Sequence, residues 1–573
     1  MSAESRAVSL GTLKEPVAEA LNEADESAWS QRVWRRDATV WKEDEANQKI
    51  IGNSLGWLTV VGKMIGVADQ IVTFADEIRL SREFDHVMLC GMGGSSLCPE
   101  VFRETFRAQE GYPELLVLDS TDPDVLASFA DQIDVARCLF VVASKSGTTT
   151  EPLVFYKYWY DQVRQRKANP GASFLAITDP GTRMVEMATA DQFRHIFLNP
   201  SDIGGRYSAL SYFGMVPAAL MGVDIKRLLV RAEAMAEACG AGVSAKQNPG
   251  MLLGAIMGEC AKVGRNKLTI ITDEKVSALG LWIEQLVAES TGKEGKGILP
   301  VNAESLGKPS DYGDDRLFVS VSVGPVVGDN RDKLEALAKV GHPVVYRPLN
   351  DLYDLGSEFF LWEIATAFAG WRLGINPFDQ PNVQESKDAT KELLDSFKAH
   401  GKLKEQEALV SDGMLTVYAS DRTRETLPAS SVSDVVRAHL AGAKAGDYVA
   451  LLDYIEETPE IEATLQSIRI RIRNATKCAT TTGYGPRFLH STGQLHKGGP
   501  DTGVFIQITA ADKVDLPIPN EPYTFSVLKQ AQALGDFRSL SAHGRRAIRV
   551  DLGTDVVRGL KELMGLVSSF KTI

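Results

Sequence analysis

The chain has 573 residues, which corresponds to roughly three or four domains of about 150 residues each, so a single small core is excluded. It carries 62 lysine and arginine residues against 75 aspartate and glutamate residues, a net charge of −13 that argues against binding to nucleic acid. With 44% hydrophobic and 24% charged residues, the composition is that of a globular protein.

The six cysteines are scattered without a C-x-x-C pair, which is typical of reduced thiols. The N-terminal stretch lacks the apolar core of a secretory signal, and no apolar run is expected to approach the roughly 20 residues that span a bilayer. The sequence therefore predicts a cytoplasmic protein without a membrane partner.

Residues 1–80 are poor in strand patterns and are expected to form a helical region. In the region 81–245, short β-rich runs alternate with helix-length segments such as 151–166, and this alternation predicts a doubly wound parallel sheet. The expected strands of this region are 86–90, 115–119, 138–143, 174–178 and 195–198.

A second α/β region is expected over 246–395, with a helix near 358–369. Its expected strands are 268–272, 317–323 and 344–349. A polar stretch over 388–407 leads to a further α/β region, 396–573, with strands expected at 415–419, 448–454 and 504–509. The predicted fold class is therefore α/β.

The first candidate site is the glycine-rich segment 91–96 (GMGGSS), which directly follows an apolar strand. Glycines let backbone N–H groups approach an anion, and the helix N-terminus that follows adds a favourable partial charge. A dinucleotide fingerprint is the alternative, with Asp119 as the ribose ligand, but Ser96 replaces the third glycine and Asp119 lies 28 residues after Gly91 instead of about 20. A purely structural turn is a third interpretation.

The second candidate is the segment 144–151 (SKSGTTTE), which has five hydroxyl side chains in seven positions between a strand and a helix. Several hydroxyl donors at a helix N-terminus suit a phosphate monoester, which accepts many hydrogen bonds. The nucleotide-binding pattern G-x-x-x-x-G-K-[ST] is absent from the sequence. A simple helix cap is the alternative, although one hydroxyl would be enough for it.

The third candidate is the segment 204–208 (GGRYS), where Gly205 and Arg206 could converge on a substrate oxygen and stabilise negative charge there. An arginine in a surface turn is the alternative.

The fourth candidate is Glu289, which continues the apolar stripe of a predicted helix at helical spacing, whereas Glu284 faces away. A buried carboxylate near the end of a helix could take and return a proton, although it could also simply reach solvent.

Taken together, these segments resemble the phosphoglucose isomerase family, which carries G-x-G-G-S, S-K-x-x-T-T, G-G-R-x-S, a glutamate in E-S-x-G-K, and D-Q-x-G-V-E-x-x-K. The first four patterns occur in this order between residues 91 and 297. The fifth appears as 379–387 (DQPNVQESK), where Gln380 and Lys387 keep the spacing but Asn382 and Gln384 replace glycine and glutamate. The chain is most similar to the isomerase half of bacterial transaldolase–phosphoglucose isomerase fusions, but it has too little sequence before residue 80 for a transaldolase barrel.

One motif departs from the usual order of this family. A family histidine in H-S-x-G-Q commonly stands between the glutamate and the D-Q segment, but the segment 311–316 contains no histidine. The pattern occurs instead as 490–496 (HSTGQLH), after Lys387. The resemblance assigns this role to His490, with His496 as the rival.

The resemblance implies two sugar-isomerase (SIS) domains at 81–245 and 246–395, with the helical region 1–80 before them and the region 396–573 after them. It also implies reversible conversion of D-glucose 6-phosphate and D-fructose 6-phosphate through a cis-enediol, in glycolysis and gluconeogenesis, without a metal or an organic cofactor. The expected partner is a small sugar phosphate, and the expected assembly is a homodimer. A non-catalytic phosphosugar sensor and a nicotinamide-dependent oxidoreductase are the rival functions, and mannose 6-phosphate stays open as an additional substrate.

The roles that the resemblance carries over fall into two groups. The expected catalytic residues are His490 and Lys387 for ring opening, Glu289 for proton transfer between C2 and C1, and Arg206 for the charge of the enediolate. The expected substrate-binding residues are Gly94, Ser95, Ser144, Lys145, Ser146, Thr149, Gly205 and Gln380.

Overall fold

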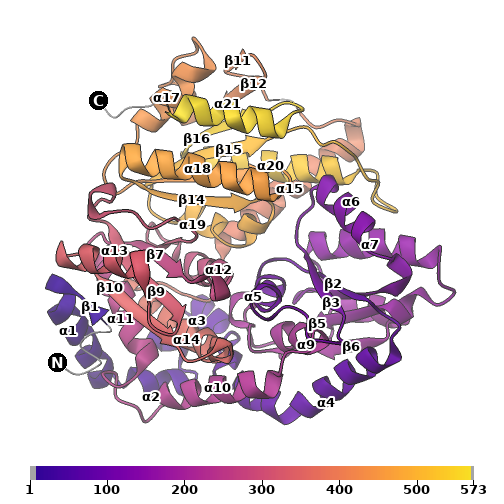
Figure 1. The fold of residues 1–573 in the computed structure, drawn as a ribbon, viewed down its shortest axis with the longest axis horizontal. Coiled ribbons are helices and arrows are strands. Elements are labelled where there is room, and N and C mark those ends of the chain that lie inside the picture. The colour runs from indigo at the N-terminus through magenta and orange to yellow at the C-terminus, as the bar shows by residue number, and fades with distance from the viewer. Residues whose placement is uncertain (1–7, 405, 569–573) are drawn as a thin grey trace.

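The computed structural model describes residues 8–404 and 406–568, which form three β-sheets with helices packed around them. In Figure 1 the first sheet is purple, the second lies among magenta and red helices, and the third is orange to yellow. Helices α5 (Leu97–Phe106) and α12 (Leu279–Thr291) lie near the centre of this view, where the three parts of the chain approach one another. The α/β fold class is confirmed, whereas the domain boundaries at 81, 246 and 396 stay a prediction.

The first sheet is wholly parallel and has the strand order β3-β2-β4-β5-β6. Its strands are β2 (His86–Cys90), β3 (Glu114–Leu118), β4 (Cys138–Ala143), β5 (Phe174–Thr178) and β6 (His195–Leu198). The inner strands are continuous apolar runs because helices cover both faces of the sheet. The chain reverses its direction of progress across the sheet between β2 and β4, and such a switch point is where ligands bind in open α/β sheets.

Helices α6 (Pro123–Gln132), α7 (Thr150–Arg164), α8 (Arg183–Ala190) and α9 (Tyr212–Leu220) complete the first α/β unit. The glycine-rich loop follows β2 and the hydroxyl-rich loop follows β4, so both lie at the carboxyl edge beside the switch point.

The second sheet has the order β1-β10-β9-β7-β8, with only β1 antiparallel. Its strands are β1 (Val8–Ser9), β7 (Lys267–Thr272), β8 (Leu299–Val301), β9 (Arg316–Val323) and β10 (Val344–Leu349). Strand β1 comes from the region expected to be helical, and it covers the edge of β10 with two residues. The helices of this unit are α10 (Ile225–Ala238), α11 (Pro249–Lys262), α12, α13 (Gly328–Lys339) and α14 (Leu355–Leu373), the last of which is almost entirely buried.

Helices α1 (Lys14–Glu26), α2 (Trp29–Trp34), α3 (Glu45–Gly52) and α4 (Val60–Ser81) precede the first sheet. Within the described residues, the helical segment Gly56–Ser81 is long and apolar enough, by length and composition alone, to cross a membrane. The sequence-based expectation that no apolar run is long enough to span a bilayer overlooked this segment, in which charged residues such as Lys63 and Asp69 interrupt the apolar ones. Its buried residues recur every three or four positions and α4 packs against α9 and α10, as expected for a helix with one face in a protein core.

The third sheet has the order β11-β12-β16-β15-β13-β14 and belongs to the C-terminal region. Its strands are β11 (Val410–Asp412), β12 (Leu415–Ala419), β13 (Tyr448–Tyr454), β14 (Ala479–Tyr484), β15 (Gly503–Thr509) and β16 (Arg546–Asp551). The helices around it are α16 (Asp421–Arg424), α17 (Val432–Ala441), α18 (Pro459–Thr476), α19 (Gly493–Gly498), α20 (Phe525–Ala542) and α21 (Val556–Ser568).

The polar stretch that was expected to connect the second and third regions is largely helical. Helix α15 (Pro381–His400) covers most of it and packs against α20. Its polar composition reflects an exposed face, while Val383, Leu393 and Leu394 are buried. This helix carries Lys387 and begins next to Gln380, so it connects two predicted site residues to the C-terminal region.

Candidate active site

The glycine-rich loop and the Gly-Gly-Arg turn touch each other directly. Residues Gly93–Ser95 and Gly205–Tyr207 each form a short 3-10 turn. A Cβ atom added to Gly94 would lie 2.1 Å from the carbonyl oxygen of Gly205, so only glycine permits this approach of the two backbones. The structure thus brings together two segments that the sequence separates by more than 100 residues.

The hydroxyl-rich loop is organised by its own side chains. Ser144 Oγ donates to Thr149 Oγ1 at 3.1 Å, and the hydroxyls of Ser146 and Thr148 are 3.0 Å apart. Thr149 is the N-cap residue of α7 by position, but its side chain makes no capping hydrogen bond. The simple helix-cap interpretation therefore does not describe this loop, and the first N–H groups of α7 are not used by that hydroxyl. The ammonium of Lys145 bonds to Asp179 Oδ2 at 2.6 Å, which leaves the backbone of Lys145 as its contribution to the loop.

Arg206 is buried and holds Glu289 in a fixed place. Its Nη1 donates to Glu289 Oε1 and to Gln380 Oε1, both at 2.9 Å, while Nε donates to Ser290 Oγ at 2.8 Å. Glu289 itself is 6% exposed. The surface-turn alternative for the arginine and the solvent-reaching alternative for the glutamate are both excluded by these positions.

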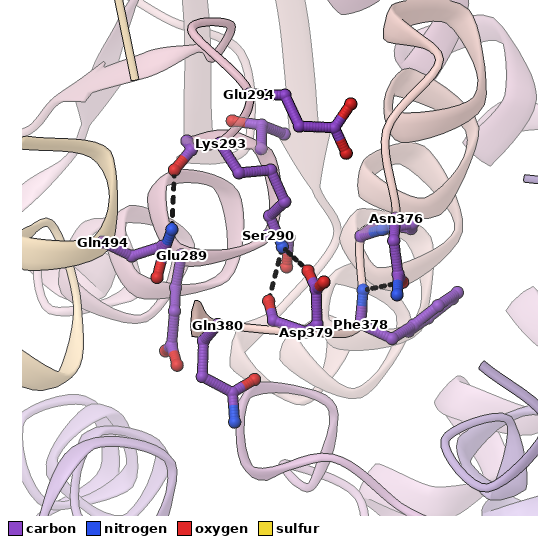
Figure 2. Close-up of polar contacts among 12 residues, drawn as sticks. Glu289, Ser290, Lys293, Glu294, Asn376, Phe378, Asp379, Gln380 and Gln494 are labelled. Carbon is purple, nitrogen blue, oxygen red and sulfur yellow. Dashed lines mark hydrogen bonds and ion pairs between the residues drawn. The ribbon is translucent and has the colours of Figure 1, made fainter. Parts of the chain in front are cut away.

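The segment just before α15 completes this cluster, as Figure 2 shows. Lys293 Nζ donates to the Asp379 carboxylate (2.6 Å) and also to its main-chain carbonyl. The same carbonyl accepts from Arg206 Nη2 at 3.0 Å. Arg206, Glu289, Gln380 and this aspartate therefore belong to one hydrogen-bonded network, which is buried at Arg206 and Glu289 and reaches the surface at Gln380.

Gln285 connects this network to the C-terminal region. Its Nε2 donates to Glu289 Oε2 at 3.2 Å and to the main-chain oxygen of His490 at 2.7 Å. A Cβ atom added to Gly93, which has a φ of +57°, would lie 2.8 Å from Gln285 Nε2 and 3.0 Å from His490 Cβ. The glycine-rich loop, α12 and the histidine segment therefore meet at one point.

His490 faces a carboxylate that the sequence had not singled out. Its Nε2 lies 3.4 Å from Glu151 Oε1, and Gln532 Nε2 donates to the same oxygen at 2.7 Å. Burial alone would raise the pKa of Glu151, but the charges of His490 and Lys387 and the hydrogen bond from His490 hold it below its usual value. Its position in the first turn after the hydroxyl-rich loop is the sequence signal that could have identified it.

The rival histidine, His496, lies in the core. Its Nδ1 is 2.9 Å from Tyr448 Oη, its ring packs on Phe505, and burial lowers its pKa well below the usual value. This neutral, buried ring is part of the core packing, whereas His490 lines an open cavity.

A cavity of about 390 Å³ lies between the hydroxyl-rich loop, α15 and the histidine segment, with Thr149, Glu151, Lys387, His490 and Gln532 among its lining residues. Glu289 and Arg206 are not part of its wall and are reached through Gln285. Among the predicted binding residues, Thr149 lines this cavity. The remaining ones lie outside its lining: Gly94, Ser95, Ser144, Lys145, Ser146, Gly205 and Gln380.

The dinucleotide interpretation of the glycine loop finds no support in the surroundings of Asp119. Ser96 Oγ donates to its Oδ2 at 3.0 Å, and Arg487 forms a bidentate pair with it at 2.8 and 2.9 Å. A carboxylate committed to an arginine from the C-terminal region is a poor acceptor for ribose hydroxyls.

Three carboxylates outside this site lie close enough together to hold a metal ion, namely those of Asp122, Asp124 and Asp512. Lys529 Nζ donates to Asp122 at 2.8 Å and also to Asp512. One ammonium group thus already bonds to two of the three carboxylates, and the cluster connects α6 with α20.

Comparisons with known proteins find similarity to sugar-phosphate isomerases. A family model described as phosphoglucose isomerase matches residues 45–304. The glucose-6-phosphate isomerase of Heliobacterium modesticaldum is 29% identical over 376 residues, which are 56% of this chain and 82% of that protein.

Two solved structures share the fold. A hypothetical protein from Thermus thermophilus matches with a TM-score of 0.56 and 21% identity, over 67% of this chain and 99% of its own. A glucose-6-phosphate isomerase from Chlamydia trachomatis matches with a TM-score of 0.50 and 19% identity, over 65% and 78%. The family model spans both phosphate-loop candidates, Arg206 and Glu289, and curated relatives named glucose-6-phosphate isomerase match the same part of the chain, so the resemblance to phosphoglucose isomerase is confirmed.

Proposed function

We propose that this protein interconverts D-glucose 6-phosphate and D-fructose 6-phosphate by opening the sugar ring and moving a proton through a cis-enediol. The observation that carries the proposal is the link from Glu289 through Gln285 to His490, which joins a buried carboxylate and its arginine to a histidine at the wall of a cavity. Proton transfers of this kind need positioned acids and bases, and the proposal includes no metal or organic cofactor.

In this proposal the hydroxyl-rich loop holds the phosphate group. Ser144, Ser146 and Thr149 supply hydroxyls, and the backbone at Lys145 and the N-terminus of α7 supply N–H groups and a favourable dipole. Binding the phosphate orients the rest of the sugar, so binding energy far from the reacting carbons contributes to catalysis. Gly94, Ser95, Gly205 and Gln380 then border the remainder of the substrate.

His490 and Lys387 perform the ring-opening step, in which the ring oxygen gains a proton and the anomeric hydroxyl loses one. Both side chains line the cavity, and Glu151 lies 3.4 Å from the imidazole. A carboxylate in this position orients the ring, as the acid partner of a catalytic histidine does in other enzymes.

Glu289 then takes the proton from C2 of the open-chain aldose and returns it to C1 of the cis-enediol. The guanidinium of Arg206 offsets the negative charge on the enediolate oxygen. Since Arg206 is fixed by Ser290 and by the segment before α15, its charge does not need to be reoriented during the reaction.

One chain supplies every residue of this proposed site, including His490 from the C-terminal region. We infer that catalysis does not require residues from a second copy. A cytoplasmic location and a homodimer remain part of the proposal, because a soluble sugar phosphate is the substrate and the family relationship favours such an enzyme.

The decisive experiment is a coupled assay of glucose 6-phosphate formation from fructose 6-phosphate, with the wild type and Glu289→Gln in parallel. The amide cannot accept the C2 proton, so we expect kcat to fall by about 10²–10⁴-fold while substrate binding is largely retained. His490→Ala should be impaired on the cyclic sugar more than on its open-chain form. Near-normal turnover by Glu289→Gln would remove that residue from the mechanism, and a wild type that binds the sugar phosphate without turnover would favour the sensor.

A further inference from the structure

Lys293 is a buried cation without a role in the steps described above. It follows Gly292, the C-cap residue of α12, and is 2% exposed. Its ammonium donates to the carboxylate of Asp379 at 2.6 Å and to the main-chain oxygen of the same residue. Burying an ammonium is costly unless it is paired and hydrogen-bonded, so this contact is a specific feature of the site. In Figure 2 its side chain points to Asp379, beside Ser290.

The segment that Lys293 holds is the one that presents hydrogen-bond acceptors to Arg206. Arg206 Nη2 donates to the carbonyls of Pro377 at 3.1 Å and Asp379 at 3.0 Å, and Nη1 donates to Gln380 Oε1 at 2.9 Å. The Asp379 carbonyl is therefore shared by two cations. If the lysine contact were lost, three of the acceptors that fix the guanidinium could move together.

The charges in this cluster are balanced in pairs. Lys293 lies on the carboxylate of Asp379, and Arg206 lies on the carboxylate of Glu289. The main-chain oxygen of Asp379 accepts from Arg206 Nη2 at 3.0 Å, so an Asp379 carboxylate without its lysine partner would be free to compete with Glu289 for the guanidinium. Each pair thus keeps the other in its place.

We propose that Lys293 is a positioning residue for the isomerisation: by holding Asp379, it fixes the segment 377–380 and leaves the charge of Arg206 to Glu289 and the enediolate. The inference rests on the roles proposed above for Arg206 and Glu289. It predicts an effect on the chemical step rather than on phosphate binding, because the phosphate loop belongs to a different part of the site.

The protonation state of Lys293 should give the activity a pH dependence that a purely structural role would not produce. Burial lowers its pKa to about 8, with Asp379 and Glu289 opposing the change and Arg206 adding to it. From α19 the nearby side chain is the neutral Gln494, which bonds to the Gly292 carbonyl. Since the charged ammonium is the functional form, activity should fall as the pH rises through about 8.

The test compares Lys293→Met with Lys296→Met in the full chain. Lys296 lies three residues after Lys293, and its exposed ammonium donates to the Leu373 carbonyl. The Lys296→Met variant therefore controls for the loss of a nearby lysine. We expect Lys293→Met to lower kcat by about 10–100-fold with KM changed less than threefold, because a displacement of about 1 Å in a catalytic group costs that much. The alkaline limb near pH 8 should disappear from its residual activity. Lys296→Met should stay within twofold of the wild type.

Asp379→Asn is the second variant, and its side chain is 25% exposed, so the protein should tolerate the change. Removing the carboxylate that favours the charged lysine should move the alkaline limb to lower pH. An unchanged kcat in a folded Lys293→Met, or the same fold-loss at every pH in both variants, would overturn the inference. An inactive wild type would instead refute the proposed function, so the two failures are distinguishable.

Discussion

Gly94→Ala is the sharpest test of the way in which the glycine-rich loop builds the site. The added Cβ atom would lie 2.1 Å from the carbonyl oxygen of Gly205 and 2.4 Å from its carbonyl carbon. Real Cβ atoms essentially never approach another heavy atom closer than 3.0 Å, so the two backbones must separate by about 1 Å. The turn that moves carries Arg206, and the loop that moves carries Ser95.

A displacement of about 1 Å of a positioned catalytic group costs about 10²-fold in rate. Forcing extra volume into a packed contact also costs about 1–3 kcal/mol of stability. We therefore expect kcat/KM to fall by about 10²-fold, with a lower melting temperature but an intact fold. The coupled isomerase assay measures the first effect, and thermal unfolding with circular dichroism measures the second.

Gly204→Ala is the matched control for this prediction. A Cβ atom at this neighbouring position would meet only Tyr207 Cδ2, at 3.9 Å, which is an ordinary contact. Both variants add one methyl group to the same contact region, so a difference between them reports the close approach and not the change of glycine to alanine. If Gly94→Ala kept kcat/KM within threefold of the wild type, the loop contact would not set the catalytic geometry.

Two further predictions concern the cavity and the phosphate loop. Glu151→Gln should lower kcat by at least about tenfold, because His490 loses the carboxylate that orients its ring from 3.4 Å away. Adding His490→Ala should cause little further loss if the two residues act as a unit, whereas additive losses would separate their roles. Ser144→Ala should raise KM for the sugar phosphate several-fold with kcat less affected, as steady-state kinetics and competition by inorganic phosphate would show; an unchanged KM would place the phosphate elsewhere.

The first sheet could be predicted well because its strands are buried on both faces. The expected ranges 86–90, 138–143 and 174–178 agree with β2, β4 and β5, since continuous apolar runs at regular spacing have few alternative structures. Strands β14 and β16 were not predicted. The first is rich in threonine and glycine, and the second carries three charged residues in six positions, so neither shows a continuous apolar run.

The local motifs of the site were visible in the sequence, but the contacts between them were not. Loops that end strands and begin helices can be read from short segments, and this identified Ser144 and Arg206, whereas helical spacing identified Glu289. The link from Gln285 to His490 joins residues 205 positions apart, and no periodicity or spacing encodes such a contact. Glu284 shows the same limit: it does face away from the apolar stripe, yet it is only partly exposed and lines a pocket together with residues of the C-terminal region, and desolvation there raises its pKa to about 7.

The C-terminal region has a functional reason to be part of this enzyme. The family model ends at residue 304. Two side chains from beyond this point, His490 and Gln532, contact Glu151. From the same region, Gln494 bonds to the Gly292 carbonyl at the end of the helix that carries Glu289. In the proposed mechanism, the third sheet therefore acts as the scaffold that presents the ring-opening histidine to the other two units, and the proposed site takes residues from all three parts of the chain.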